Sequence, residues 1–151
     1  MDINQRAPVV VHEQVQVAAD VQTVWDVLTD IERWPTWNKA VRSVSLHGPV
    51  RRGTSFDWKA GPGTIKSRIA EVEAPNRIVW TGVTLGTRAV DAFSFEAVDG
   101  GTLVREDESW EGFLARMFRS RMERTLRSSI RDGLRSLKAE AERRGDTAEA
   151  A

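Results

Sequence analysis

Alternation of apolar and polar residues predicts a β-strand near the start of the chain. In the segment Val9–Val17, valines occupy the odd positions 9, 11, 15 and 17, whereas His12, Gln14 and Gln16 occupy even positions. A period of two places successive side chains on opposite faces of a strand. Val9–Val17 is therefore expected to be a strand with one apolar face, and Glu13 is the exception to its pattern.

Two short helices are predicted after this strand. Asp20 can cap a helix whose apolar residues Val21, Val24, Trp25 and Leu28 follow helical spacing. A tighter segment, ERWPTWN, comes next, in which Pro35 limits continuation of a helix.

The middle of the chain predicts six further strands. Short β-branched or aromatic runs alternate there with turn residues such as His47-Gly48-Pro49, Gly61-Pro62-Gly63 and Asp99-Gly100-Gly101. The short connections favour an antiparallel meander. The predicted strands are Val41–His47, Thr54–Ala60, Thr64–Glu73, Arg77–Val83, Arg88–Ala97 and Thr102–Trp110.

A long amphipathic helix is predicted from Phe113 to about Arg144. Its apolar face contains Phe118, Met122, Leu126, Ile130, Leu134, Leu137 and Ala141, and its other face contains Arg116, Arg124, Arg127, Arg131, Arg135 and Lys138. One sheet with an apolar face and one helix long enough to cover it predict a single α+β domain over residues 9–144. Residues 1–8 and 145–151 are expected to be flexible ends.

Composition narrows the chemistry that this domain can perform. The 151 residues include no cysteine, which excludes disulfides, thiolate metal sites and a cysteine nucleophile. There are two histidines and no tyrosine, but six tryptophans and five phenylalanines. Neither a signal peptide nor a run of about 18 apolar residues is present, so a cytoplasmic protein without a membrane span is expected.

Four motifs carry a resemblance to a known family. They are VWDVLTDIERWPTWNKAV, GxxFxWKxGPG, WTGxxxGTRA and GGTLVxExESWEG. Together with the order of elements, they resemble the START-like or SRPBCC superfamily, and within it the polyketide cyclase/dehydrase group, over residues 9–143. The resemblance implies a helix-grip fold, in which a seven-stranded antiparallel sheet curves around a long C-terminal helix, with two short helices after the first strand.

Members of that superfamily enclose an apolar cavity between sheet and helix. Some bind lipids, polyketides or other hydrophobic molecules, some are aromatases or cyclases, and some act on other proteins. The resemblance therefore implies binding of a small hydrophobic ligand, with a cyclase or dehydratase-like enzyme as the alternative. A protein-interaction or stress-response module is the second alternative.

Alternation assigns the residues that face this cavity. Phe56 and Trp58 share a face, as do Ala89, Asp91, Phe93 and Phe95, and in the last strand Val104, Glu106, Glu108 and Trp110 point inward, unless the phase with Leu103 inward applies. Aromatic rows are common in ordinary cores, but Ser129 and Gly133 lie where a dense core would place leucine. The predicted ligand-binding residues are Trp34, Trp37, Phe56, Trp58, Ser67, Ile69, Trp80, Phe93, Phe95, Glu106, Trp110, Met122, Leu126, Ser129, Ile130 and Gly133.

Asp91 and Glu108 are the candidate catalytic residues. A carboxylate among aromatic side chains is costly unless it is paired or protonated, so a raised pKa would suit a general acid or a ligand contact. The alternatives are an internal ion pair with Arg68 or Arg88, or a position at a wet cavity mouth.

Other chemistries are not expected from this sequence. His12 and His47 are predicted to face solvent, no spacing typical of metal ligands exists, and no nucleotide-binding motif is present. We therefore expect no metal and no cofactor. The segment Trp34–Trp37 either forms a hydrophobic lid over the cavity or closes the end of the core.

Charge is balanced overall but not locally. Arg and Lys total 22 and so do Asp and Glu, yet residues 113–144 carry nine arginines and one lysine against four acidic residues, a net charge of +6. A solvated helix face explains this, and an anionic protein partner is the alternative. Nucleic acid is not expected, because no aromatic side chains alternate with the arginines for base stacking.

Overall fold

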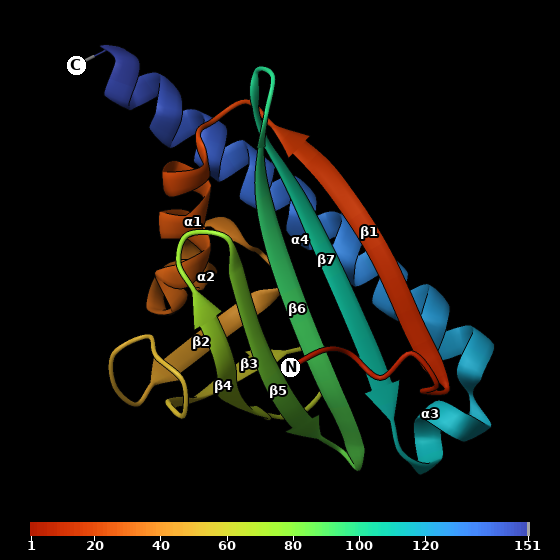
Figure 1. Ribbon diagram of the computed structural model, residues 1–151. Coiled ribbons are helices and arrows are strands. Elements are labelled where there is room, and N and C mark those ends of the chain that lie inside the picture. The colour runs from red at the N-terminus through yellow and green to blue at the C-terminus, as the bar shows by residue number, and fades with distance from the viewer. Residues whose placement is uncertain (151) are drawn as a thin grey trace.

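The computed structural model describes residues 1–150 and has the predicted helix-grip architecture. Seven antiparallel strands form one sheet in the order β1-β7-β6-β5-β4-β3-β2, and the sheet curves around helix α4 (Figure 1). The elements are β1 (Val9–Val17), α1 (Val21–Thr29), the 3₁₀ helix η1 (Ile31–Arg33), α2 (Trp34–Trp37), β2 (Val41–Leu46), β3 (Ser55–Ala60), β4 (Ile65–Glu73), β5 (Arg77–Thr84), β6 (Thr87–Val98), β7 (Gly101–Glu111), α3 (Phe113–Met117) and α4 (Arg119–Ala150).

The local signals in the sequence account for most of these boundaries. Each strand begins and ends within one residue of its predicted range. The carboxylate of Asp20 accepts a hydrogen bond of 2.7 Å from the backbone N–H of Thr23, which caps α1 as predicted. Leu85 and Gly86 both have positive φ, at 45° and 73°, and form the two-residue turn between β5 and β6.

The core lies between the concave face of the sheet and helices α1 and α4. The predicted apolar face of α4 supplies Leu126, Ile130, Leu134, Leu137 and Ala141, all buried. A smaller apolar cluster of Ile3, Val79 and Ala92 lies on the opposite face of the sheet, where residues 1–8 cross it (Figure 1). The curved sheet therefore has a main core on one side only, as an α+β fold requires.

The last helix differs from the prediction at both ends. A break at Phe118, whose φ and ψ are −118° and 41°, divides the predicted single helix into α3 and α4. Helix α4 also continues past Arg144 to Ala150. The apolar period is uninterrupted across the break, because Phe118 still follows it, although its side chain is 46% exposed rather than in the core.

The N-terminal segment makes contacts that its polar sequence did not indicate. The backbone N–H of Asn4 donates to Ser109 Oγ at 3.1 Å, and its side chain donates to Glu111 at 2.8 Å. Arg77 donates to the backbone oxygen of Met1. The flexibility expected for residues 1–8 and 145–151 stays a prediction.

Gly112 gives a first testable prediction about the fold. It joins β7 to α3 with a φ of 125°, and a Cβ atom built on it would lie 2.4 Å from the backbone oxygen of Gly86. We expect Gly112→Ala to lower the free energy of unfolding by about 2 kcal/mol, because both the backbone conformation and the contact would have to change. Urea denaturation measures this.

Gly100→Ala is the matched control for this substitution. Gly100 also has a positive φ, 82°, but no atom lies within 4 Å of the Cβ position. Its loss of stability should therefore be smaller, about 1 kcal/mol. Equal losses in the two variants would contradict the importance of the contact between Gly112 and Gly86.

Candidate functional site

A cavity of about 620 Å³ lies between the concave face of the sheet and α4. This volume is within the range typical of small-molecule sites. Residues from α1, α2, β3–β7, α3 and α4 line it. Most of the lining is apolar, and Arg121 is the one lysine, arginine or histidine among the described lining residues.

Aromatic side chains form one wall of the cavity. Trp80 stacks on Phe93 with ring centroids 5.4 Å apart, and Trp34 meets Trp58 edge to face at the same distance. The indole N–H of Trp34 donates to the backbone oxygen of Leu28 at 2.8 Å, and that of Trp58 donates to Ser67 Oγ at 3.0 Å. These contacts fix the rings in place, so the wall is preformed.

Small residues next to this wall provide the space. Strand pairing places Ser67 opposite Gly82 and Gly82 opposite Ala89, so three small residues lie side by side on β4, β5 and β6. A Cβ atom at Gly82 would approach Ile65 and Ser67 to 3.2 and 3.3 Å. On the helix side, a Cβ at Gly133 would meet only Asn38, at 3.9 Å.

Most predicted ligand-binding residues lie along the cavity. They are Trp34, Trp37, Trp58, Ser67, Trp80, Phe93, Glu106, Trp110, Met122, Leu126, Ser129, Ile130 and Gly133, together with the candidate catalytic residues Asp91 and Glu108. The inward phase of β7 is confirmed, since Val104 is fully buried and Glu106, Glu108 and Trp110 line the cavity. Their contact with a ligand stays a prediction.

Phe56, Ile69 and Phe95, which were predicted to bind the ligand, do not line the cavity. Phe56 is covered by the rings of Trp34 and Trp80, and Phe95 packs edge to face on Trp25 of α1 with ring centroids 5.7 Å apart. Ile69 is fully buried. Alternation assigned the correct face of the sheet but not the places where other side chains cover that face.

Other lining residues were missing from the prediction. Ala89 was placed on the inner face but not assigned to the site, and Gly82 shares a face with Trp80 by the same alternation, which could have identified both. Leu85, Leu114 and Phe118 lie along the cavity near the turn between β5 and β6 and the break before α4. Leu85 and Phe118 are exposed, which places the cavity mouth at this end of the molecule.

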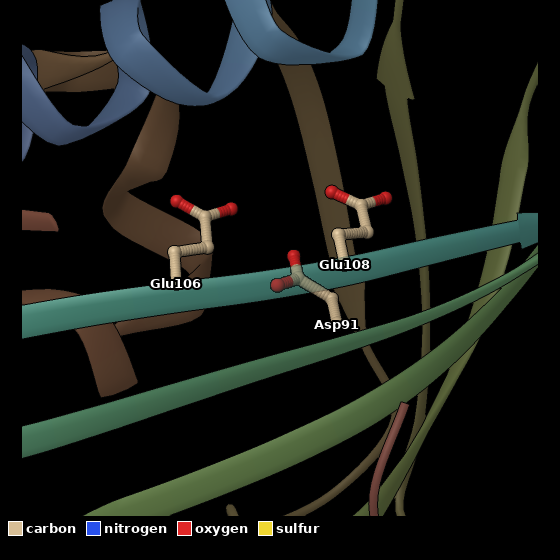
Figure 2. Close-up of side chains that lie close together, drawn as sticks. All are labelled: Asp91, Glu106 and Glu108. Carbon is tan, nitrogen blue, oxygen red and sulfur yellow. The ribbon is translucent and has the colours of Figure 1, made fainter. Parts of the chain in front are cut away.

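Three carboxyl groups meet inside the cavity. Asp91 on β6 pairs with Glu108 on β7, and Glu106 precedes Glu108 by two residues on the same face. Oxygen atoms of the three groups lie within 4.8 Å of one another, and Glu106 and Glu108 extend toward α4 with Asp91 between them (Figure 2). We call these three residues the carboxyl cluster.

Burial and mutual repulsion favour the protonated forms of the carboxyl cluster. Asp91 and Glu106 are 8% and 7% exposed, and burial followed by the charges of neighbouring carboxylates holds the pKa of each well above its usual value. Burial raises the pKa of Glu108 to about 7, although a hydrogen bond of 2.7 Å from the indole N–H of Trp110 opposes the shift. The three groups therefore titrate as one coupled system.

The ion pairs considered from the sequence do not form. Within residues 1–150, none of the three carboxyl groups has a lysine, arginine or histidine nitrogen within 4.0 Å. Arg68 and Arg88 are exposed, and Arg88 pairs with Glu111 in the strand register. The carboxyl cluster thus faces the cavity without a cationic partner.

Three polar atoms of the lining lack a hydrogen-bond partner among the described residues. They are the indole nitrogen of Trp37, the hydroxyl oxygen of Thr84 and Oδ1 of Asp91, and each is inaccessible to solvent. Unpaired buried polar atoms are rare in proteins and destabilising. All three residues line the cavity, so a bound molecule that reached these atoms would supply the missing partners.

The carboxyl cluster is also the one group of described residues with several convergent metal-ligating oxygens. Carboxylate oxygens suit hard divalent cations, but the neighbouring lining is aromatic and offers few further oxygen ligands. The expectation that the protein uses no metal or other cofactor stays a prediction.

The two histidines lie on the surface, away from the cavity. His12 Nδ1 is 2.6 Å from Asp107, and His47 Nε2 is 3.3 Å from Asp57. All four side chains are at least one-third exposed. Their predicted outward orientation is confirmed.

Trp34 and Trp37 occupy different positions, although both line the cavity. Trp34 is buried among Phe56, Trp58 and Trp80, so it closes the end of the core. Trp37 is half-buried, with its indole nitrogen unpartnered. Movement of this segment as a lid stays a prediction.

Part of the arginine-rich face of α4 folds back onto β1. Arg127 and Arg131 both contact Glu13 Oε1, at 2.8 and 3.0 Å. This explains why Glu13 interrupts the valine pattern, because it lies on the inner face and pairs with the helix. The remaining arginines are exposed, and an anionic protein partner for them stays a prediction.

Comparison with known proteins fits the fold and the cavity. The family model described as polyketide cyclase / dehydrase and lipid transport matches residues 8–142. The chain belongs to this family. No curated protein matches it significantly in sequence. Within the described residues, no helix has the length and apolar character needed to cross a bilayer.

Several solved structures share the fold at low sequence identity. The hypothetical protein jhp0584 from Helicobacter pylori has a TM-score of 0.82 at 18% identity, covering 92% of this chain and 91% of its own. The di-domain ARO/CYC StfQ from the steffimycin biosynthetic pathway has a TM-score of 0.77 at 20% identity, and the match covers 90% of this chain and 52% of StfQ. Ara h 8.0201 has a TM-score of 0.73 at 11% identity, and the match covers 87% of this chain and 96% of Ara h 8.0201.

Proposed function

We propose that the protein binds one small hydrophobic molecule, such as a lipid, a polyketide or an aromatic metabolite, in the cavity between the sheet and α4. The observation that carries this proposal is the cavity of about 620 Å³ with a preformed aromatic wall and a few convergent polar groups. Family membership supports it, because the family is described by polyketide cyclisation and lipid transport. The apolar wall would hold the body of the molecule, and the carboxyl cluster its polar end.

A second candidate function is catalysis of a cyclase or dehydratase type. The observation that favours it is a carboxyl group, Glu108, whose pKa of about 7 suits proton transfer near neutral pH. A wall that holds a flexible chain in a folded shape would add to this by orienting its reacting atoms. The likeness to StfQ, a di-domain ARO/CYC, agrees with this candidate. We also propose a cytoplasmic location for the protein, whichever of the two functions it performs.

Binding can be tested with the neutral fluorescent probe 1,6-diphenylhexatriene. We expect saturable binding of one probe per chain, with quenching of tryptophan fluorescence because several tryptophans line the cavity. Absence of saturable binding at probe concentrations up to its solubility would contradict the proposal.

Native mass spectrometry of protein from its own host separates binding from catalysis. Recovery of a discrete apolar molecule that stays unchanged on incubation supports binding alone, whereas its chemical conversion supports the enzyme. Matched incubation with the Glu108→Gln variant is the control for conversion, since the amide cannot transfer a proton in this pH range.

A further inference from the structure

The carboxyl cluster has no internal cation to balance it. Asp91, Glu106 and Glu108 lie within 4.8 Å of one another in a largely apolar cavity, without an ion pair to any residue of the described chain. Such a group must either retain protons or meet a cation from outside. A cationic ligand group that reaches the polar end of the cavity would therefore stabilise the ionised forms of the cluster.

An unpartnered hydrogen-bond acceptor in the cluster is a second, independent observation that favours a ligand with a donor group. Asp91 is 8% exposed, lies along the cavity, and has an oxygen, Oδ1, without any hydrogen-bond donor in residues 1–150. Glu108 already accepts from Trp110, which fixes its carboxyl group in orientation. When ionised, Asp91 therefore has an acceptor free for a donor on the ligand.

Two aromatic side chains adjoin the cluster. In the strand register Asp91 lies opposite Trp80, and Glu106 lies opposite Phe93, the two rings that stack on each other. Aromatic faces attract cations, and the attraction is larger when water is excluded. Carboxylates beside aromatic side chains suit an organic ammonium group better than a metal ion, which needs several further oxygen ligands.

From these observations we infer that the preferred ligand is a hydrophobic molecule that carries a protonated amine, with the ammonium group bound by Asp91, Glu106 and Glu108 and the apolar body against the tryptophan wall. This inference rests on the proposed function and names the substrate class for the same cavity. An ammonium group provides up to three N–H donors together with the charge that the cluster lacks.

The pH dependence of binding follows from the carboxyl cluster, because the charged groups around it are paired or exposed. Arg121 of α4 lies along the cavity, Glu13 of β1 is paired with Arg127 and Arg131, and Asp107 on the outer face of β7 is paired with His12. Among these groups, only the three carboxyl groups of the cluster are acidic, lie within the largely apolar cavity and have no ion pair. Their ionisation therefore controls binding of a cation. A bound ammonium should release protons from it, and affinity should rise between pH 5.5 and pH 8.

The test compares 2-(1-naphthyl)ethylamine with 2-(1-naphthyl)ethanol, which differ only in the polar group. At pH 8 we expect isothermal titration calorimetry to give at least tenfold tighter binding of the amine, with release of protons detected from the buffer dependence of the heat. At pH 5.5 the preference should fall to threefold or less.

Variants locate the effect. Asp91→Asn combined with Glu108→Gln should weaken amine binding at least tenfold at pH 8 and change alcohol binding less than threefold. Glu96→Gln removes an exposed carboxylate from the other face of β6 and should change neither. Circular dichroism confirms that each variant is folded.

Several results would overturn the inference, and they differ from failure of the proposed function. Equal affinity for amine and alcohol at pH 8, or equal weakening of both by the double variant, excludes ammonium recognition while leaving hydrophobic binding intact. Competition by 1 mM Ca²⁺ or Mg²⁺ through the same carboxyl groups would instead identify a metal site. If both naphthyl compounds and diphenylhexatriene fail to bind, the proposed function itself fails.

Discussion

Replacing Ser129 and Gly133 together by phenylalanine is expected to weaken diphenylhexatriene binding at least 100-fold. Both residues lie one turn apart on the cavity side of α4, and the Cβ position of Gly133 has only Asn38 nearby, at 3.9 Å. Two phenyl groups would therefore extend into the space that a ligand body needs. Fluorescence titration measures the loss of affinity.

Two variants control for this effect. Ser128→Phe adds the same side chain to the exposed, outer side of the same helix and should leave binding unchanged. Gly133→Ala should retain binding and raise the free energy of unfolding by about 1 kcal/mol, because glycine is a poor residue in the middle of a helix. Full affinity in the double phenylalanine variant would show that the probe binds outside the cavity.

The second large effect is a dependence of stability on pH that originates in the carboxyl cluster. Burial and mutual repulsion raise the pKa values of Asp91 and Glu106 above those of the unfolded chain, which are about 4. The folded protein therefore retains protons that the unfolded chain releases. The stability contribution is fully present below pH 4 and is lost as pH rises through the folded pKa values.

The pH window is set by the groups that shift in the opposite direction. Hydrogen bonds and charges from basic partners lower the pKa values of Glu71, Glu140 and Glu142, so the stability that they contribute is lost only in more acidic solution. Between pH 4.5 and pH 8.5 the carboxyl cluster should dominate the contribution of the acidic groups. The melting temperature is the measurement.

The Asp91→Asn/Glu106→Gln variant isolates this contribution, because it removes two of the three titrating groups at nearly constant volume. Its melting temperature relative to the wild type should be about 5–10 °C higher at pH 8.5 than at pH 4.5. Glu96→Gln, on the exposed outer face of β6, should follow the wild type. A difference in melting temperature that is the same at both pH values would contradict the raised pKa values.

Periodicity in the sequence predicted the fold closely because each strand has one face against the core and one against solvent. The alternation in Thr54–Ala60 and Arg88–Ala97 placed Trp58, Asp91 and Phe93 on the correct face. It did not indicate the break at Phe118, because the apolar period continues through it. It also placed Phe56 and Phe95 among the predicted ligand-binding residues, because alternation assigns a side chain to one face of the sheet but does not show which other side chains cover it.

The pairing of the carboxyl groups was available in the sequence but not recognised. Asp99-Gly100 is a strong signal for a two-residue turn, and such a turn between β6 and β7 places Asp91 opposite Glu108. The sequence prediction chose these two residues for their aromatic surroundings and treated Glu106 only as a ligand contact. Turn geometry would have identified all three as neighbours.

The sequence by itself determined the strands, the amphipathic helix and the inward direction of the acidic and aromatic residues, because these follow from local periodicity and turn chemistry. Only the tertiary structure decided that a cavity remains between α4 and the small residues Ser67, Gly82 and Ala89 of the sheet. It also decided that Arg127 and Arg131 pair with Glu13 and leave the carboxyl cluster without a cation. Both depend on where the helix crosses the sheet, which is set by packing between residues more than a hundred positions apart in the chain.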